Sequence, residues 1–244
     1  MGASEWRQLP AKHVLEVGCG AGRFTEVLLD AGSYVTSIDL SRAVEANAET
    51  APVSSRHRIA QADMLELPFV PRGFDVVFCL GVVQHAPSPE IAIAALFSHV
   101  RPGGQLVFDQ YGHTISWYTK TQPLFRRALA PVGARRRMEI TETLVNRLFP
   151  LHARLERSPL AHAVVSRLSP VATYFHGYPE LTLEHQLEWA LVDTHDALSD
   201  RYKRFTTVRR TRSLLGFLGA VDVRVERRRS LIVGRCWRSS SGAP

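Results

Sequence analysis

The sequence predicts an α/β protein with a mostly parallel seven-stranded sheet, helices on both of its faces and a helical insertion after the fifth strand. Short apolar runs alternate with amphipathic runs up to residue 112, as expected when crossover helices join parallel strands. A mainly helical stretch follows, and two apolar runs near the end are joined by a charged turn. A chain of 244 residues with 45% hydrophobic content is long enough for one such core with an elaboration.

The first half contains five expected strands. They lie at residues 14–17, 34–38, 57–60, 74–80 and 105–109. The fourth run is almost continuously apolar, which is typical of a strand buried on both faces. Helices are expected at residues 23–31, 41–50 (capped by Ser41) and 89–100, with a turn at residues 101–104.

The second half predicts an insertion and a return to the sheet. Ile140, Leu144, Val145, Leu148 and Phe149 share one helical face before Pro150. Further helices are expected after the caps Ser158 and Thr182, and from Thr207 to Leu218 before Gly219. Residues 221–225 and 231–235 predict an antiparallel pair at the sheet edge, and the end from Arg238 is expected to be frayed. We therefore expect a core (1–112), an insertion (113–192) and a C-terminal completion of the core (193–244).

Charge is unevenly distributed. The net charge is −4 over residues 1–112, +7 over 113–175, −6 over 176–200 and +10 over 201–244. A basic face in the second half would attract an anionic substrate, a membrane surface or nucleic acid, although a single charged run is more often a solvated face. Three widely spaced cysteines, Cys19, Cys79 and Cys236, show no metal-ligand spacing. With no apolar run long enough to span a bilayer and no signal-peptide core in residues 1–10, we expect a cytoplasmic protein.

A glycine-rich turn after the first strand is the strongest motif. Residues 14–24 read Val-Leu-Glu-Val-Gly-Cys-Gly-Ala-Gly-Arg-Phe. Gly18, Gly20 and Gly22 allow a tight turn and close approach of a ligand, and ligands of open α/β sheets bind at the carboxyl ends of the strands. Asp39 ends the second strand, 21 residues after Gly18, where a carboxylate can accept hydrogen bonds from two ribose hydroxyls.

Two cofactor classes share this arrangement. A dinucleotide site needs a small residue where this chain has Arg23, so that helix and strand can pack closely around a pyrophosphate. Glu16 places an anion close to the pocket, which disfavours a pyrophosphate and suits a cationic sulfonium with an amino-acid tail. A nicotinamide-dependent oxidoreductase is therefore the weaker alternative.

Over residues 14–112 the chain resembles the class I S-adenosylmethionine-dependent methyltransferases, which have a Rossmann-like fold. The matching series comprises the glycine motif, Ile38-Asp39, Gln61-Ala62-Asp63, Phe74-Asp75-Val76-Val77 and Arg101-Pro102-Gly103-Gly104. An ordered series is more specific than any one member. The first expected strand begins close to the start of the sequence, so we expect the helix that usually precedes it to be missing or truncated.

The resemblance implies roles for several residues. Asp39 would hold the ribose, Asp63 would contact the adenine amino group with Met64 packed on the ring, and the Gly18–Gly22 backbone would cradle the methionine part. Glu16, Cys19, Phe24, Leu40 and Leu80 complete the predicted set that binds S-adenosyl-L-methionine. Asp63 alternatively caps a turn. Asp75 is expected to form local hydrogen bonds at the start of its strand, away from the cofactor. No metal is expected.

The tail carries a less specific resemblance. Residues 189–202 resemble a segment in small-molecule methyltransferases that have a helical insertion before the last helix. After Thr206-Thr207 this subgroup tends to have an acid, where this chain has Arg209-Arg210.

Methyl transfer needs a base only if the acceptor atom carries a proton. His85, after the fourth strand where acceptors bind in this fold, is the best candidate for a base or an orienting group; alternatively it packs against the cofactor and caps the next helix. His195, in the tail segment, is the second catalytic candidate; alternatively its ring N–H is satisfied within a helix that packs against the insertion. Tyr202 and His113 are weaker ones.

The insertion is expected to form a lid over the acceptor. Its size favours a bulky acceptor, and its arginines, at residues 126–127 and 135–137 among apolar helices, suit an anionic, glycosylated or lipid-linked acceptor near a membrane surface. We therefore expect transfer to an O or N atom of a small to medium-sized acceptor. Nucleic-acid- or protein-directed methyl transfer is the alternative, but stacking aromatics are scarce among the arginines and no nucleic-acid partner is expected. The acceptor, the methylated atom and the oligomeric state stay open.

Overall fold

The structure, a computed structural model, describes residues 9–51 and 54–240. Most of residues 1–10, where we expect no signal peptide, and most of the C-terminal end that we expect to be frayed lie outside these residues. The chain divides into two compact units. The sheet unit comprises Met1–His113 and Tyr202–Pro244, and the helical unit comprises Thr114–Arg201.

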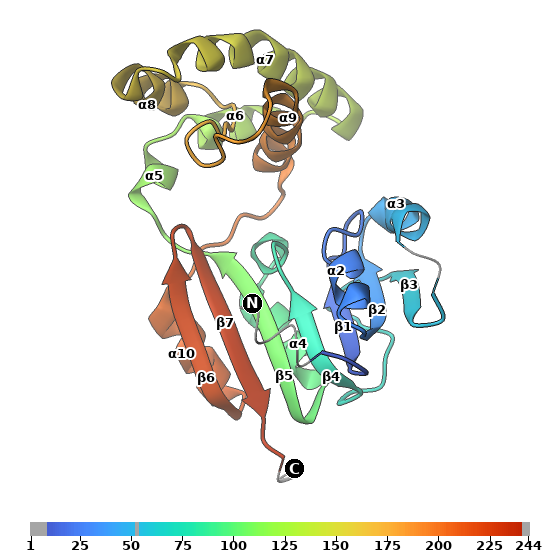
Figure 1. Cartoon of the computed structure of the whole chain (residues 1–244). Helices are drawn as coiled ribbons and strands as arrows, with labels where there is room; N and C mark the ends of the chain where they lie inside the picture. Colours follow the sequence, from blue (N-terminus) through green and yellow to red (C-terminus); the bar gives the residue numbers. More distant parts are fainter. Residues whose placement is uncertain (1–8, 52–53, 241–244) are drawn as a thin grey trace. The chain divides into compact units, whose positions relative to one another are not determined.

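Seven strands of the sheet unit form one sheet in the order β3-β2-β1-β4-β5-β7-β6 (Figure 1). The bounds are β1 (His13–Val17), β2 (Tyr34–Asp39), β3 (His57–Gln61), β4 (Phe74–Cys79), β5 (Val100–Tyr111), β6 (Ala220–Arg228) and β7 (Leu231–Arg238). The pairs among β1 to β5 are parallel, and β7 pairs antiparallel with both β5 and β6. The predicted mixed sheet with an antiparallel pair at its edge is confirmed.

The segment expected as a turn before the fifth strand is part of the strand. β5 begins at Val100, opposite Phe74, and residues 101–104 bulge out before Gln105 pairs with Val76. Gly103 has a φ of 73°, which glycine adopts without strain. The turn prediction was wrong because antiparallel and parallel ladders can continue past a glycine-containing bulge.

Helices cover both faces of the sheet. Their bounds are α2 (Thr25–Asp30), α3 (Ala43–Thr50), the 3-10 turn η1 (Val83–His85), α4 (Pro89–Ser98) and α10 (Val208–Phe217). The Ser88 hydroxyl caps α4 and the Thr207 hydroxyl caps α10. The N-cap of α3 is Arg42 rather than the expected Ser41, whose hydroxyl still accepts a hydrogen bond from the Ala43 N–H.

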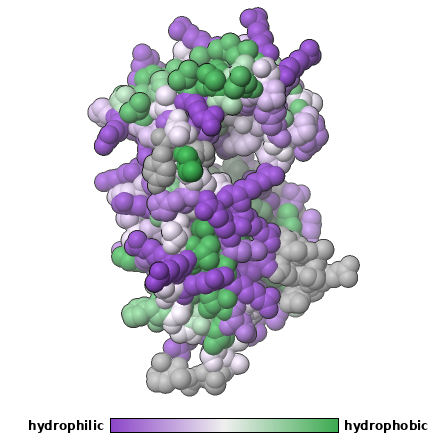
Figure 2. All heavy atoms as spheres, turned by 90° about the vertical axis from the view of Figure 1, so that its left-hand side faces the viewer, coloured by the Kyte–Doolittle hydropathy of each residue, from purple (hydrophilic) through white to green (hydrophobic). Residues whose placement is uncertain are grey.

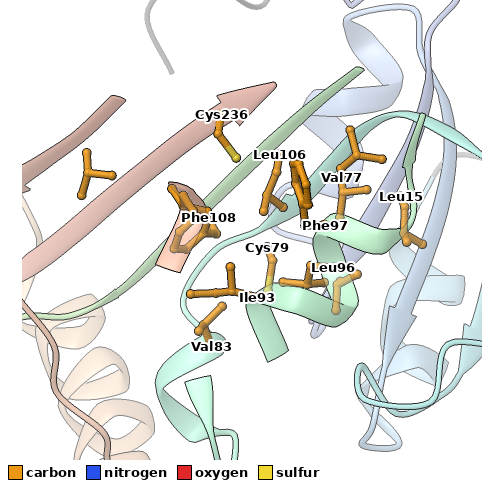
Figure 3. Close-up of a cluster of buried hydrophobic side chains, with 14 of the residues drawn as sticks. Leu15, Val77, Cys79, Val83, Ile93, Leu96, Phe97, Leu106, Phe108 and Cys236 are labelled. Carbon is orange, nitrogen blue, oxygen red and sulfur yellow. The ribbon is translucent and has the colours of Figure 1, made fainter. Parts of the chain in front are cut away.

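Alternate residues of the strands feed two hydrophobic clusters. Val77 and Cys79 of β4 point into the cluster with Ile93, Leu96 and Phe97 of α4, which Figure 3 shows. Val76 and Phe78 join the other cluster with Leu28 and Leu29 of α2. β4 is therefore buried on both faces, as its continuous apolar run predicts.

The helical unit contains five helices among its described residues. They are α5 (Ile115–Tyr118), α6 (Gln122–Leu129), α7 (Ala134–Leu155), α8 (Pro159–Leu168) and α9 (Leu183–Ser199). Their small core contains Val145, Phe149, Val171, Phe175 and Ala190. The predicted face of α7 is apolar as expected, but α7 continues through Pro150 to Leu155. Ser158 and Thr182 cap α8 and α9 as predicted.

The second predicted domain boundary falls inside a helix. α9 runs without a break from Leu183 to Ser199, and the helical unit ends at Arg201 rather than at residue 192. His195, which we assigned to the C-terminal completion of the core, therefore belongs to the helical unit. We placed the boundary within residues 189–202, the tail segment that carries the less specific resemblance. No glycine or proline interrupts α9 to separate this segment from the insertion.

Apolar side chains are exposed on the helical unit. Leu160, Val164 and Leu168 repeat every four residues along α8 and are 78%, 51% and 67% exposed. Figure 2 shows hydrophobic atoms gathered on this unit at the top of the view, between long hydrophilic side chains. Among the described residues, no helix is both long and apolar enough to span a membrane.

Candidate functional site

The carboxyl ends of four neighbouring strands bring the predicted cofactor residues to one edge of the sheet (Figure 1). Val17 of β1 pairs with Ile38, Asp39 of β2 pairs with Gln61, and Cys79 of β4 pairs with Phe108. The glycine turn, Asp39, Asp63 and the loop after β4 therefore follow strand ends at the same level. This is the edge at which open α/β sheets bind ligands.

The glycine turn needs glycine at specific positions. Gly18, Gly20 and Gly22 have φ values of 77°, 51° and 100°, in the region that favours glycine. A Cβ at Gly18 would overlap the side chain of Val82 in the loop after β4, whereas a Cβ at Gly20 would meet nothing within 4 Å. The turn thus packs closely against the fourth-strand loop and leaves open space beside Gly20.

Asp39 holds the glycine turn in place. Its Oδ2 accepts a hydrogen bond from the Gly20 N–H at 2.9 Å, and its Oδ1 accepts from the Ser41 N–H at 2.8 Å and the Ser41 hydroxyl at 2.7 Å. The carboxylate is only half-buried. Each carboxylate oxygen has more than one acceptor site, so Asp39 keeps capacity for further donors.

Glu16 is the most deeply buried carboxylate of this region, at 2% exposure. Its Oε2 accepts hydrogen bonds from the hydroxyls of Thr25 at 2.6 Å and Ser37 at 2.7 Å. Its Oε1 accepts none from the described residues. Burial raises the pKa of Glu16, while the two hydroxyls oppose the rise.

The remaining predicted cofactor residues lie in different environments. The Asp63 carboxylate accepts a hydrogen bond from the Leu65 N–H at 2.8 Å, and Met64 packs against the core while partly exposed. Leu40 is 66% exposed. Cys19 is buried, and desolvation raises the pKa of its thiol to about 12. Phe24 packs edge-on against Phe78, and Leu80 contacts the same cluster.

Asp75 lies at the opposite edge of the sheet. Its carboxylate accepts a hydrogen bond from the His13 N–H at 2.9 Å, pairs with Lys12 at 3.7 Å and pairs with Arg101. It ties the amino ends of β1 and β4 together. The predicted local role of Asp75 is confirmed.

His85 lies in η1 beyond the carboxyl end of β4, where its ring meets Tyr111 edge-on at 5.9 Å between centroids. Its Nε2 is 3.2 Å from the Gln84 side-chain amide. The helix cap that was its alternative role belongs to Ser88. A group that the sequence analysis missed, Asp109 near the carboxyl end of β5, accepts a hydrogen bond from the Gly81 N–H at 2.6 Å.

Burial raises the pKa of Asp109, while the Gly81 N–H and the nearby His85 oppose the rise. Asp109 ends the strand that the sequence predicts at residues 105–109, and a polar residue at that position is the signal that would have identified it.

The chain returns to the sheet unit across these strand ends. The Arg204 N–H donates to the Gln84 carbonyl at 3.0 Å, and the Thr206 N–H donates to the Tyr111 carbonyl at 2.9 Å. Phe205 stacks on Tyr111 with centroids 6.0 Å apart and lies 5.6 Å from the His113 ring. Together with His85 these rings form an aromatic group beside the fourth- and fifth-strand ends.

His195 lies in the helical unit on α9. It lines a cavity of about 200 Å³ with Met138 and Thr141 of α7 and Leu191 and Asp196 of α9. The two predicted catalytic histidines thus belong to different units, while His85, His113 and Tyr202 belong to the sheet unit.

Comparison with known proteins finds relatives of the part of the chain that forms most of the sheet. A family model described as a methyltransferase domain matches residues 15–108. The ubiquinone biosynthesis O-methyltransferase of Pseudomonas fluorescens (strain Pf0-1) is 39% identical over 107 residues, covering 41% of this chain and 45% of that protein. That of Pseudomonas savastanoi pv. phaseolicola is 40% identical over 106 residues, with the same coverage. The chain thus spans less than half the length of these curated relatives.

Solved structures share the fold at low identity. Magnesium protoporphyrin IX methyltransferase from Synechocystis PCC 6803, solved with bound SAH, has a TM-score of 0.51 at 16% identity and covers 94% of this chain and 75% of that chain. A putative methyltransferase from Haloferax volcanii, in complex with the activator Trm112, has a TM-score of 0.53 at 11% identity, covering 97% and 88%. The predicted Rossmann-like fold is confirmed.

Proposed function

We propose that the protein transfers a methyl group from S-adenosyl-L-methionine to an O or N atom of a small to medium-sized acceptor, which is supported by the methyltransferase domain model that matches residues 15–108. The observation that carries this proposal is the Asp39 carboxylate hydrogen-bonded to Gly20 in a turn of three positive-φ glycines. The family match disfavours a nicotinamide-dependent oxidoreductase, and so does Arg23, which stands where a dinucleotide site needs a small residue.

The residues at the sheet edge fit this cofactor. Asp39 would accept hydrogen bonds from the ribose, Asp63 would contact the adenine amino group, and Met64 would pack on the ring. The open space beside Gly20 is where a ligand can approach the backbone. The Glu16 Oε1 atom, without a donor among the described residues, adds a buried negative charge that favours a cationic ligand.

Bound there, the cofactor supplies an electrophilic methyl group, and the protein needs mainly to align an acceptor with it and to exclude water. We propose that the acceptor binds beside the aromatic group of His85, Tyr111, His113 and Phe205. His85 would take the proton of a hydroxyl acceptor or orient an amine. Asp109, close enough to influence His85 electrostatically, would orient the imidazole.

We also propose that the helical unit acts as a lid and acceptor-binding element. Residues 113–175 have a net charge of +7, which suits an anionic, glycosylated or lipid-linked acceptor. His195 would contact the acceptor from the cavity on α9. The three free, buried cysteines suit a cytoplasmic protein.

Peripheral contact with an anionic membrane is part of this proposal. It is supported by the exposed stripe Leu160, Val164 and Leu168 on α8 together with the basic charge of the same unit. Vesicles of phosphatidylcholine with phosphatidylserine should co-sediment the protein, and Leu160→Glu should reduce this. Equal sedimentation with neutral vesicles would contradict the contact.

The methyl acceptor can be classified in one experiment. The protein is incubated with methyl-labelled S-adenosylmethionine and a host-cell extract, and the products are divided into organic, aqueous small-molecule and macromolecular fractions. Label in a small-molecule fraction that is absent with Asp39→Ala supports the proposal. Label confined to nucleic acid or protein would replace it with macromolecule-directed transfer, and failure to bind the cofactor would contradict it.

A further inference from the structure

Four arginines line one cavity of the helical unit. Arg126 and Arg127 lie in the last turn of α6, Arg137 lies in the first turn of α7, and Arg201 follows α9. The cavity has a volume of about 420 Å³, and Asp200 also lines it. This volume lies within the range of small-molecule sites, and all of the lining residues belong to the helical unit.

Arg137 is fixed in this cavity. Its guanidinium donates to the Ser199 carbonyl at 3.0 Å and to the Val132 carbonyl at 2.8 Å. Its Nε, which is buried, has no partner among the described residues. Carbonyl partners hold the side chain in place but bring no formal charge, so the positive charge of Arg137 remains available to an anion.

The charges around the cavity do not balance. Four arginines and Asp200 give its lining a net formal charge of +3. The carboxyl ends of α6 and α9 each contribute roughly −0.5 of an elementary charge, which explains part of the arginine cluster. Arg126, Arg127 and Arg137 form no ion pair with a described carboxylate, so after the two helix ends an excess of about two positive charges remains on these three side chains by this estimate. A set of guanidinium groups with excess charge is the arrangement that proteins use for phosphate.

The neighbouring arginines differ in their partners. Arg135 and Arg136 lie outside the cavity and pair with Glu139 at 3.5 Å and 2.9 Å. In the predicted basic run at residues 135–137, Arg135 and Arg136 therefore share one carboxylate on the surface of α7, whereas Arg137 lines the cavity. Overall basicity alone does not explain this division.

We propose that this cavity binds a phosphate or diphosphate group through Arg126, Arg127, Arg137 and Arg201. The group belongs either to a soluble phosphorylated molecule or to a phospholipid headgroup. The inference deepens the anionic acceptor of the proposed function. Its test measures binding rather than methyl transfer, so failure of one is distinguishable from failure of the other.

The test compares two double variants of equal charge change. Inorganic pyrophosphate is titrated calorimetrically into the full chain, into Arg126→Gln/Arg127→Gln and into Arg135→Gln/Arg136→Gln. Arg126→Gln/Arg127→Gln should weaken pyrophosphate binding by about tenfold or more, equivalent to about 1.4 kcal/mol. Arg135→Gln/Arg136→Gln, which changes the arginines that pair with Glu139, should weaken it by less than about twofold. Arg127→Gln alone, at an exposed position, keeps the test valid if the double variant fails to fold.

Vesicle binding distinguishes the two sources. Co-sedimentation is measured with phosphatidylcholine vesicles with and without phosphatidate. Pyrophosphate binding that is lost in Arg126→Gln/Arg127→Gln indicates a soluble phosphorylated ligand. A phospholipid headgroup is indicated if the protein binds vesicles only when they contain phosphatidate, loses this binding in Arg126→Gln/Arg127→Gln, and does not bind pyrophosphate. Binding to neither, or equal losses in both pairs, would overturn the proposal.

Discussion

The sheet unit and the helical unit position their polar side chains in different ways. In the sheet unit, parallel register brings Asp39, Asp63 and Asp109 to one edge. In the helical unit, the ends of α6, α7 and α9 bring Arg126, Arg137 and Arg201 together by packing. The family match falls entirely within the sheet unit. The methyltransferase family match therefore concerns the sheet unit, and the role in acceptor binding that we propose for the helical unit rests on its charge and its cavities.

The two predicted catalytic histidines give the largest expected contrast. His85→Gln should lower kcat by about 10²–10⁴-fold for a hydroxyl acceptor if His85 is the base, with cofactor affinity unchanged. His195→Gln should change mainly the KM for the acceptor, because His195 lies in the helical unit. Steady-state kinetics with the acceptor that the labelling experiment reveals measures both. Equal losses of kcat in the two variants would remove the division of roles.

Large-to-small substitutions in the two cores test whether the units are independent. Phe108 is fully buried in the sheet unit and Phe149 is 6% exposed in the helical unit. Each change to alanine should cost about 3–5 kcal/mol of unfolding free energy. We expect Phe149→Ala to leave S-adenosylhomocysteine affinity within about twofold of wild type, since only the helical core is weakened. Calorimetric unfolding with and without that ligand measures both effects, and a matching loss of affinity in Phe149→Ala would contradict this independence.

One buried group in each unit should respond to acid in opposite directions. His152 is fully buried in the helical unit with neither ring nitrogen hydrogen-bonded to a described residue, and desolvation lowers its pKa from 6.5 to about 4. Because the unfolded chain then binds more protons, its contribution to stability is lost as the pH falls from about 6.5 to about 4. His152→Leu should flatten this loss in urea unfolding, whereas exposed His185→Leu should not.

Glu16 has the opposite sign. Burial raises its pKa from the usual 4.5, so the folded state binds more protons and its contribution to stability is lost as the pH rises through the folded pKa. Glu16→Gln should therefore gain stability relative to wild type between pH 4.5 and neutral pH. A variant whose stability difference from wild type is constant with pH would contradict the raised pKa.

Helix caps give the smallest expected effect. The Ser158 hydroxyl accepts a hydrogen bond from the Ala161 N–H in the helical unit, and the Thr207 hydroxyl accepts one from the Arg210 N–H in the sheet unit. Each change to alanine should cost about 1 kcal/mol. Chemical denaturation followed by circular dichroism measures the loss. A loss near zero would show that these caps are replaced by water.

Much of the sheet unit was predictable because strand-forming runs, glycine turns and caps are local signals. The ordered series from Gly18 to Gly104 predicted the strands, and the structure places Asp39 against the glycine turn. The signal was weaker where tertiary packing decides. Residues 101–104, expected as a turn, continue the ladder between β4 and β5 as a bulge. Asp109 and the rings of Tyr111 and Phe205 were missed because their proximity depends on the chain's return across the sheet.

The helices of the helical unit were predicted from the sequence, but the way in which they pack against one another was not. Helical periodicity identified the apolar face of α7, yet periodicity does not determine which helix ends meet. Arg126 and Arg201 are separated by most of the unit and line one cavity. The basic run at residues 135–137 divides between a salt-bridged surface and that cavity for the same reason.

Calorimetric titration of S-adenosylhomocysteine into wild type, Asp39→Asn and Asp75→Asn tests the central claim most directly. Both variants neutralise a carboxylate of the same sheet, one at its carboxyl edge and one at its amino edge. Losing charged hydrogen bonds to two ribose hydroxyls should weaken binding in Asp39→Asn by about 100-fold. Asp75→Asn should lower thermal stability and retain wild-type affinity. Wild-type affinity in Asp39→Asn, or no binding by the wild type, would contradict the assignment of this edge as the cofactor site.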